Sequence, residues 1–189
     1  MLQYSVHPPP QFIRTHLDRL LPSWSLPVLS VLVVLQLCQF AFLERTTETE
    51  IYKDRFRQQF LEFGSEIIFQ LGTMGHLAEM FDPRTGLPVT SPSGQARLSD
   101  VKVVGATLGY KIDRSGKCAA IVHPTWGKAV YPSTIVSSAQ PDLVAEIVAN
   151  MAATSDRCII QPIPVLNETE LRSSDPTVEG RSFLDPKPL

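Results

Sequence analysis

Several catalytic signatures are missing from this chain of 189 residues. It contains no glycine-rich phosphate loop, no HExxH helix and no GxSxG nucleophile elbow. Its three cysteines, Cys38, Cys118 and Cys158, are widely spaced and form no CxxC pair or Cys/His cluster. They therefore predict neither a disulfide framework nor a zinc site, and a reducing compartment is the default expectation.

The chain also lacks an excess of either charge. Seventeen Lys and Arg residues stand against nineteen Asp and Glu residues, which gives a net charge of −2. Nucleic-acid-binding proteins show a basic patch or stripe, so this balance argues against that class. The opening MLQYSVHPPP has neither a signal-peptide nor a transit-peptide pattern. We expect a cytoplasmic location, with a mitochondrial one as the alternative.

Apolar residues are plentiful, at 43% of the chain, and the longest uncharged run covers residues 20–43. Two prolines interrupt this run and leave residues 28–43, fewer than the roughly 20 apolar residues that a membrane-spanning helix needs. The remainder contains two glutamines, and its valine-rich composition favours a strand buried on both faces. We expect a central strand over residues 28–42, with a membrane anchor as an alternative.

Hydrophobic periodicity and turn residues place the other elements. Strands and helices interleave, so the predicted fold class is α+β, with a mixed, mainly antiparallel sheet flanked by helices. We predict one domain over residues 1–160 and a flexible, proline-rich tail over residues 161–189. The expected elements are a strand at 2–7, helices at 11–21 and 47–71 (the latter with a Thr47/Glu50 capping box), a turn-rich stretch at 81–94, a segment capped by Ser99, a hairpin of 118–123 with 129–133, a helix from Pro141 and an edge strand at 158–160.

Cys118 is the most reactive side chain that the sequence offers. Arg114 and Lys117 lie close to it in the chain, and nearby cations favour the thiolate, which is the nucleophilic and metal-binding form. A small buried apolar residue is the alternative interpretation. His123 lies on the same predicted strand but on its opposite face, so it does not form a pair with Cys118. We expect His123 to stabilise a turn.

Two further groups are candidates for contact with a ligand or partner. Asp82 and Arg84 lie in a polar turn, with Asp82 suited to the first position of a type I turn. Trp126, with Tyr131 nearby, suits stacking on a flat ligand or simple packing in the hairpin.

Two stretches of sequence are more specific indicators of a protein family than the hydrophobic periodicity. They are HLAEMFDPRTGL at residues 76–87 and LGYKIDRSGKCAAIVHPTWGKAVYPSTIVSSAQP at residues 108–141. The combination of an aromatic-Asp-Pro turn, a Gly-x-Cys strand start and a His-x-x-Trp-Gly turn resembles the methylmalonic aciduria and homocystinuria type D protein family. The resemblance covers roughly residues 1–153.

This resemblance implies a fold related to the flavin nitroreductases but without a flavin site. It implies a non-enzymatic adaptor that engages a cobalamin-processing partner protein and directs cobalamin towards methionine synthase and methylmalonyl-CoA mutase. It also implies cobalt binding by a cysteine thiolate, here Cys118, with no tightly bound cofactor of its own. We expect Asp82, Arg84 and Trp126 to contact the partner, and we expect no nucleic acid or membrane partner.

One position departs from the family pattern. Animal members carry two adjacent cysteines where this chain has Lys117 and Cys118, and the resemblance assigns cobalt to the first of them. Either Cys118 substitutes for that cysteine or cobalt binding is absent. The alternative function is a small thiol-dependent oxidoreductase or transferase on a nitroreductase-like scaffold.

Overall fold

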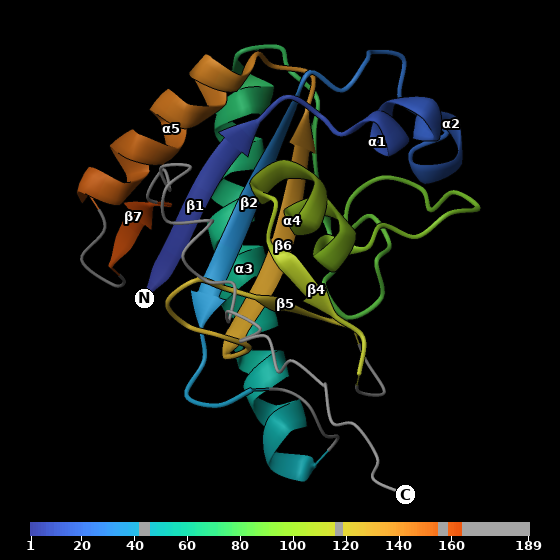
Figure 1. The fold of residues 1–189 in the computed structure, drawn as a ribbon. Coiled ribbons are helices and arrows are strands. Elements are labelled where there is room, and N and C mark those ends of the chain that lie inside the picture. The colour runs from blue at the N-terminus through green and yellow to red at the C-terminus, as the bar shows by residue number, and fades with distance from the viewer. Residues whose placement is uncertain (42–45, 116–118, 155–158, 164–189) are drawn as a thin grey trace, which may run out of the picture.

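A five-stranded sheet with helices on both faces forms the centre of the protein in the computed structural model (Figure 1). The structure describes residues 1–41, 46–115, 119–154 and 159–163. The strands are β1 (Leu2–His7), β2 (Ser30–Leu37), β3 (Ala78–Phe81), β4 (Lys111–Asp113), β5 (Ala120–Val122), β6 (Val130–Ser137) and β7 (Ile160–Pro162). The helices are α1 (Gln11–Thr15), α2 (Leu17–Leu20), α3 (Thr47–Thr73), α4 (Asp100–Leu108) and α5 (Pro141–Thr154).

The strand order in the main sheet is β3-β6-β2-β1-β7, and β4 and β5 form a separate two-stranded sheet. Only β7 runs parallel to its neighbour, β1, whereas the other pairs are antiparallel. The predicted α+β class with a mixed, mainly antiparallel sheet is therefore confirmed. The relation to the flavin nitroreductases stays a prediction. The predicted tail falls, from residue 164 onward, outside the described residues.

The valine-rich run forms the middle strand of the sheet, as predicted, although β2 is shorter than the expected strand at residues 28–42. Its side chains alternate between two cores: Val31, Val33 and Leu35 face one, and Leu32 and Val34 face the other. All five are at most 1% exposed. Burial on both faces explains why the run is continuously apolar. None of the helices in the described ranges combines the length and the hydropathy of a membrane span.

The two faces of the sheet carry different elements. Helices α3 and α5 cover one face, and α1, α2, α4 and the β4–β5 hairpin lie on the other (Figure 1). On α3, the buried side chains Phe60, Ile67 and Leu71 recur at helical spacing and pack on the sheet. The candidate residues of the hairpin and any feature along α3 therefore belong to opposite sides of the molecule.

Helix α3 begins one residue earlier than the capping pattern suggested. Thr46 is the N-cap: its hydroxyl accepts from the Thr49 backbone N–H at 3.1 Å, and the Thr49 hydroxyl accepts from the Thr46 N–H at 2.8 Å. The predicted Thr47/Glu50 pair is thus replaced by two threonines with the same reciprocal geometry. At the other end, Gly75 has a φ of +81°, which suits a helix end.

The helix expected over residues 11–21 is two short helices. It breaks at His16, whose φ of −118° and ψ of 25° are not helical. The His16 ring nitrogen Nδ1 contacts the carbonyl oxygen of Phe12 at 2.9 Å and so takes part in capping the first piece. The apolar periodicity of the segment survives the break, since Ile13, Leu20 and Leu21 are all buried in one core.

The predicted hairpin of residues 118–123 with 129–133 is wrong. Strand β5 pairs with β4, which sequence reasoning did not identify, and β6 pairs with β2 and β3. Only a single bridge, between His123 and Gly127, remains of the expected turn. Strand β6 leaves β5 because pairing with β2 gives it eight aligned residues and burial on both faces.

The edge strand β3 was not anticipated, and it is anchored through a buried carboxylate. Glu79, which is fully buried, accepts hydrogen bonds from the backbone N–H groups of Val89, Thr90 and Ser91 and from the Thr90 hydroxyl. These contacts fold the following loop back along β3 and cover an edge that is otherwise open to pairing. At the opposite edge, β7 begins two residues later than the predicted strand at 158–160.

Candidate functional site

The β4–β5 hairpin carries the segment that contains Cys118. Residues 116–118 lie outside the described residues, so the structure does not test the proposed role of Cys118. The chain leaves β4 at Asp113 and enters β5 at Ala120. The structure therefore defines the two ends between which this segment lies, Asp113 and Ala120.

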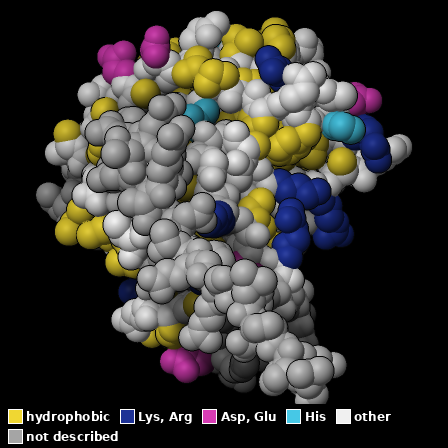
Figure 2. Space-filling view, viewed as in Figure 1, with side chains coloured by type: hydrophobic (Ala, Val, Ile, Leu, Met, Phe, Trp, Pro, Cys, Tyr) yellow, Lys and Arg dark blue, Asp and Glu magenta, His cyan; other side chains and the backbone are white. Residues whose placement is uncertain are grey.

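Basic side chains gather around the hairpin. Figure 2 shows Lys and Arg side chains together beside α4 and β4. In this part of the chain Lys102, Lys111 and Arg114 are exposed. Positive charge at this surface stabilises a nearby thiolate over a thiol.

Cys38 lies in a buried environment that favours the neutral thiol over the thiolate. It is 4% exposed, and burial raises the pKa of its thiol to about 12. Its Sγ donates to the carbonyl oxygen of Gln36 at 3.5 Å. Cys38 therefore stays a neutral thiol at physiological pH and acts as a small apolar core residue.

Asp113, at the end of β4, is held by an ion pair. Its carboxylate forms an ion pair with Lys128 and accepts from the Ser115 backbone N–H at 2.8 Å. The Lys128 ammonium and the Ser115 donors hold the pKa of the Asp113 carboxyl well below its usual range. The two residues are 15 positions apart in the sequence, so no local pattern indicates this pair.

His123 forms the second connection, and it is buried, at 4% exposure. Its Nδ1 accepts from the backbone N–H groups of Thr125 and Trp126 at 3.2 and 3.1 Å. The other ring nitrogen, Nε2, therefore carries the proton and donates to Gln3 Oε1 on β1 at 3.2 Å. The expectation that His123 stabilises a turn is confirmed, and the same ring also joins that turn to the main sheet.

Aromatic rings complete this connection. The indole of Trp126 stacks on the His123 ring with centroids 4.4 Å apart, and the Tyr110 ring meets His123 edge-on at 5.3 Å. We call Gln3, Tyr110, His123 and Trp126 the hairpin joint. Burial lowers the pKa of His123 to about 4, so the joint is uncharged at neutral pH.

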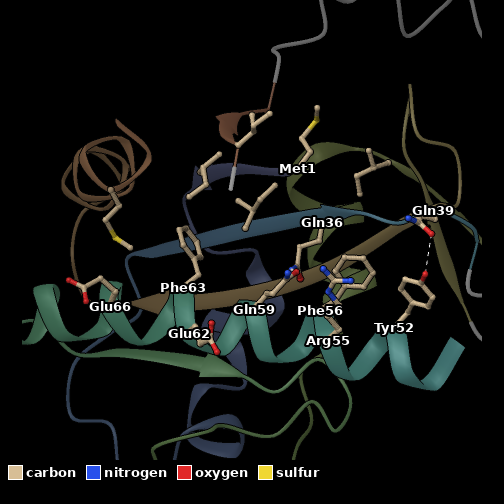
Figure 3. Close-up of a pocket in the computed structure, with 15 residues that line it drawn as sticks. Met1, Gln36, Gln39, Tyr52, Arg55, Phe56, Gln59, Glu62, Phe63 and Glu66 are labelled. Carbon is tan, nitrogen blue, oxygen red and sulfur yellow. Dashed lines mark hydrogen bonds between the residues drawn. The ribbon is translucent and has the colours of Figure 1, made fainter. Parts of the chain in front are cut away.

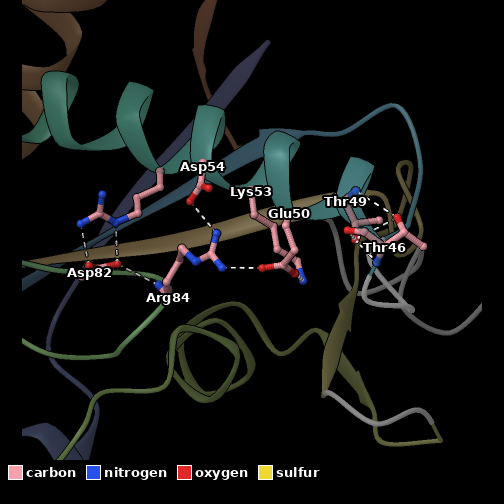
Figure 4. Close-up of polar contacts among 8 residues, drawn as sticks. Thr46, Thr49, Glu50, Lys53, Asp54, Asp82 and Arg84 are labelled. Carbon is pink, nitrogen blue, oxygen red and sulfur yellow. Dashed lines mark hydrogen bonds and ion pairs between the residues drawn. The ribbon is translucent and has the colours of Figure 1, made fainter.

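The turn after β3 brings Asp82 and Arg84 together against α3 (Figure 4). Two guanidinium nitrogens of Arg57, Nε and Nη2, donate to the Asp82 carboxylate, at 3.0 and 2.8 Å. Arg84 pairs with Glu50 and Asp54, also on α3. We call these five residues the turn clamp.

Asp82 opens a turn in the structure, as the sequence predicted. The Asp82 carbonyl accepts from the Thr85 N–H at 3.1 Å, and the Asp82 carboxylate accepts from the Arg84 N–H at 2.9 Å. Partial burial alone would raise the pKa of Asp82, but its hydrogen bonds with Arg57 and Arg84 lower it overall. The carboxylate is therefore ionised at neutral pH, as the clamp requires.

The structure does not assemble all candidates into one site. Asp82 and Arg84 share the turn clamp, whereas Trp126 belongs to the hairpin joint. Tyr131, which the sequence grouped with Trp126, lies on the α3 side and stacks on Phe56 at 5.9 Å. Partner binding by Asp82, Arg84 and Trp126 stays a prediction. No sequence signal indicated Gln3 as a partner of His123.

In the described part of the chain, no group of three or more His, Cys, Asp or Glu side chains is placed to hold a metal ion.

Comparison with known proteins gives two findings. The sequence model of the family described as "Methylmalonic aciduria and homocystinuria type D protein" matches residues 1–150. The chain is also 26% identical over 133 residues to a chicken (Gallus gallus) protein named "Cobalamin trafficking protein CblD". That alignment covers 70% of this chain and 45% of the chicken protein. The chain thus aligns with less than half of its relative's length, and the match to the family includes both the hairpin joint and the turn clamp.

Proposed function

Because this chain belongs to the methylmalonic aciduria and homocystinuria type D protein family, we propose that it is an adaptor in intracellular cobalamin trafficking. It acts with a cobalamin-processing partner protein and carries out no turnover of its own. The Cys118 thiolate binds the cobalt of cobalamin held by that partner. The observation that carries this proposal is the family match over residues 1–150, which includes the whole β4–β5 hairpin.

The chemistry of the hairpin supports this role. A thiolate is a suitable ligand for a soft or borderline metal centre, and a nearby positive charge raises the fraction of a thiol that is thiolate at neutral pH. Exposed Lys111 and Arg114 on the hairpin supply such charge. The Asp113–Lys128 pair and the hairpin joint hold the chain before and after the segment that contains Cys118. This reduces the entropy cost of ordering the segment when a large partner binds.

Visible absorption spectroscopy tests the cobalt bond directly. Cobalamin bound to its processing protein is mixed with the full chain, and thiolate binding shifts the cobalamin absorption bands. We expect a shift with the wild-type chain and none with Cys118→Ser. Lys117→Cys, which restores the two-cysteine pattern of the animal members, should strengthen the shift.

Cys38→Ser is the matched control, because its buried, protonated thiol cannot bind cobalt. It should leave the shift unchanged. An unchanged spectrum with the wild-type chain, despite complex formation measured by gel filtration, removes the cobalt bond from the proposal. Absence of both the complex and the shift rejects the adaptor role with this partner.

A further inference from the structure

A groove runs along α3 on the side of the sheet opposite the β4–β5 hairpin (Figure 3). It has a volume of about 840 Å³ and is bounded by α3, the ends of β1 and β2, and β7. This volume lies in the range of small-molecule sites. We call it the α3 groove. The proposed cobalamin role makes no use of it.

One buried amide in the α3 groove has an unmet hydrogen-bonding capacity. Gln36 on β2 is 3% exposed, and its Nε2 donates to Gln59 Oε1 on α3 at 3.3 Å. Its own Oε1 is buried and has no hydrogen-bond partner among the described residues. A buried acceptor without a donor is destabilising and is uncommon in native proteins. This oxygen is therefore a specific position at which a donor would be stabilised.

The side chains around Gln36 suit a flat apolar molecule. Phe56 and Phe63 line the groove from the same side of α3, two turns apart, which is about 10 Å along the helix axis. Gln59 lies between them in sequence, and Figure 3 shows its amide pointing toward that of Gln36. The charged lining residues Arg55, Glu62 and Glu66 are exposed, so the ligand's contacts with the two phenylalanines and the buried Gln36 amide favour a planar body with a single hydrogen-bonding group.

The side chain that hydrogen-bonds to Gln36, Gln59, lies at the surface. Gln59 is exposed, and within the described part of the chain its side chain is held by the hydrogen bond from Gln36. Exposed glutamine side chains change rotamer on the picosecond-to-nanosecond timescale. When Gln59 turns away, Gln36 presents a donor and an acceptor side by side, and a primary carboxamide offers the complementary pair.

We propose that the α3 groove is a binding site for a small, flat, apolar molecule that carries a primary carboxamide. The ligand N–H donates to Gln36 Oε1, and the ligand carbonyl accepts from Gln36 Nε2. The apolar body lies against Phe56 and Phe63. This inference does not depend on the proposed cobalamin role, since it uses neither Cys118 nor the hairpin.

Two near-isosteric probes test the hydrogen bonds. The full chain is titrated with 2-naphthamide and with methyl 2-naphthoate, which keeps the ring and the carbonyl but has no N–H. Isothermal titration calorimetry measures both dissociation constants. We expect 2-naphthamide to bind with a dissociation constant below 1 mM, about tenfold tighter than the ester, because the ester lacks the N–H that donates to the buried Gln36 Oε1.

Variants locate the site. Gln36→Met removes the amide at nearly constant volume and should abolish the preference for 2-naphthamide over the ester. Gln58→Met, on the same helix but outside the groove lining, is the matched control and should keep the preference. Gln59→Ala changes only an exposed position, so its folding is not in question, and it should bind 2-naphthamide as well as or more tightly than the wild type, because Gln36 is uncovered.

Three results would overturn the proposal. The first is no binding of 2-naphthamide at millimolar concentration. The second is equal affinity for amide and ester in the wild type. The third is tighter binding of 2-naphthoate than of 2-naphthamide, which would make Arg55, also in the groove lining, the determinant and the groove an anion site. Loss of binding in Gln59→Ala would equally reject Gln36 as the recognised group.

Discussion

The hairpin joint and the turn clamp each hold a turn in place, but one uses uncharged contacts and the other uses ion pairs. Each holds a segment that carries candidate site residues: the joint holds the turn with Trp126, and the clamp holds the turn with Asp82 and Arg84. The joint is buried and uncharged, built from ring stacking and neutral hydrogen bonds. The clamp is charged and partly exposed, with the Arg57 side chain 34% and the Asp82 side chain 13% exposed.

The difference predicts how each segment responds to its surroundings. Buried neutral contacts are little affected by salt, but removing one partner leaves other buried groups unsatisfied. Partly exposed ion pairs contribute little individually and weaken as ionic strength rises. We therefore expect the turn with Trp126 to be rigid in all salt conditions, and the turn with Asp82 to loosen at high salt, where a charged partner would also bind more weakly.

The largest expected effect comes from breaking the hairpin joint. His123→Ala removes a buried ring, leaves Gln3 and two backbone N–H groups without their partner, and opens a cavity beside Trp126. We expect a loss of about 3 kcal/mol in the free energy of unfolding at pH 7.5, measured by urea denaturation. His16→Ala, an exposed histidine that ends α1, is the control and should cost less than 1 kcal/mol. Equal losses for the two variants would mean that the joint contributes nothing specific.

A second prediction uses the titration of His123. In the unfolded chain this histidine binds a proton near pH 6.5, whereas in the folded chain its pKa is lowered to about 4 by burial. The unfolded state therefore binds more protons between pH 6.5 and 4, and stability falls as the pH falls through this window, by at most about 1.4 kcal/mol per pH unit. His123→Asn keeps an acceptor for the turn but does not titrate. The stability advantage of the wild type over this variant should therefore shrink towards pH 4.

A buried carboxyl group on the same face of the sheet as His123 changes the pH dependence of stability in the opposite direction. It should therefore be replaced before the effect of His123 is measured. Asp100, the first residue of α4, is 9% exposed, and burial raises its pKa to about 7, only partly offset by Thr134. The folded state therefore binds more protons than the unfolded state between pH 7 and 4, so this group adds stability as the pH falls. Both His123 proteins should be compared in an Asp100→Asn background. A constant difference between them across pH 4–6.5 would show that His123 titrates normally.

The elements that the sequence predicted well depend on signals within a few residues. The strand at residues 2–7, Ser99 as the cap of α4 and Pro141 at the first position of α5 were predicted from local features, and the structure confirms all three. The valine-rich run was also predictable, because continuous apolar character over that length is explained by burial on both faces.

The features that sequence reasoning missed depend on distant partners. Gln3 and His123 are 120 residues apart, and Arg57 and Asp82 are 25 apart, so no local pattern pairs them. The pairing of β5 with β4 and of β6 with β2 was likewise decided by which strand offered the longer register and the deeper burial. Gln36 is an ordinary polar residue in an apolar strand by sequence, and only the fold places it opposite Gln59 in the α3 groove.

The smallest expected effect comes from the turn clamp, and it is the one that salt should change. Arg57→Met keeps the apolar stem of the side chain but leaves Asp82, among the described residues, with only the Arg84 N–H and its own turn as partners. We expect a loss of about 1 kcal/mol in the free energy of unfolding at 20 mM NaCl, falling towards half that value at 1 M NaCl. Urea denaturation at both salt concentrations measures the two losses.

Arg55→Met is the matched control for the clamp, because Arg55 is an exposed arginine on the same helix, outside the clamp. It should change stability by less than 0.5 kcal/mol at either salt concentration. The His123→Ala loss, measured beside it, should be the same at 20 mM and 1 M NaCl. If the Arg57→Met loss proved equally independent of salt, the Arg57–Asp82 pair would behave as a buried contact, and the physical distinction between the clamp and the joint would not hold.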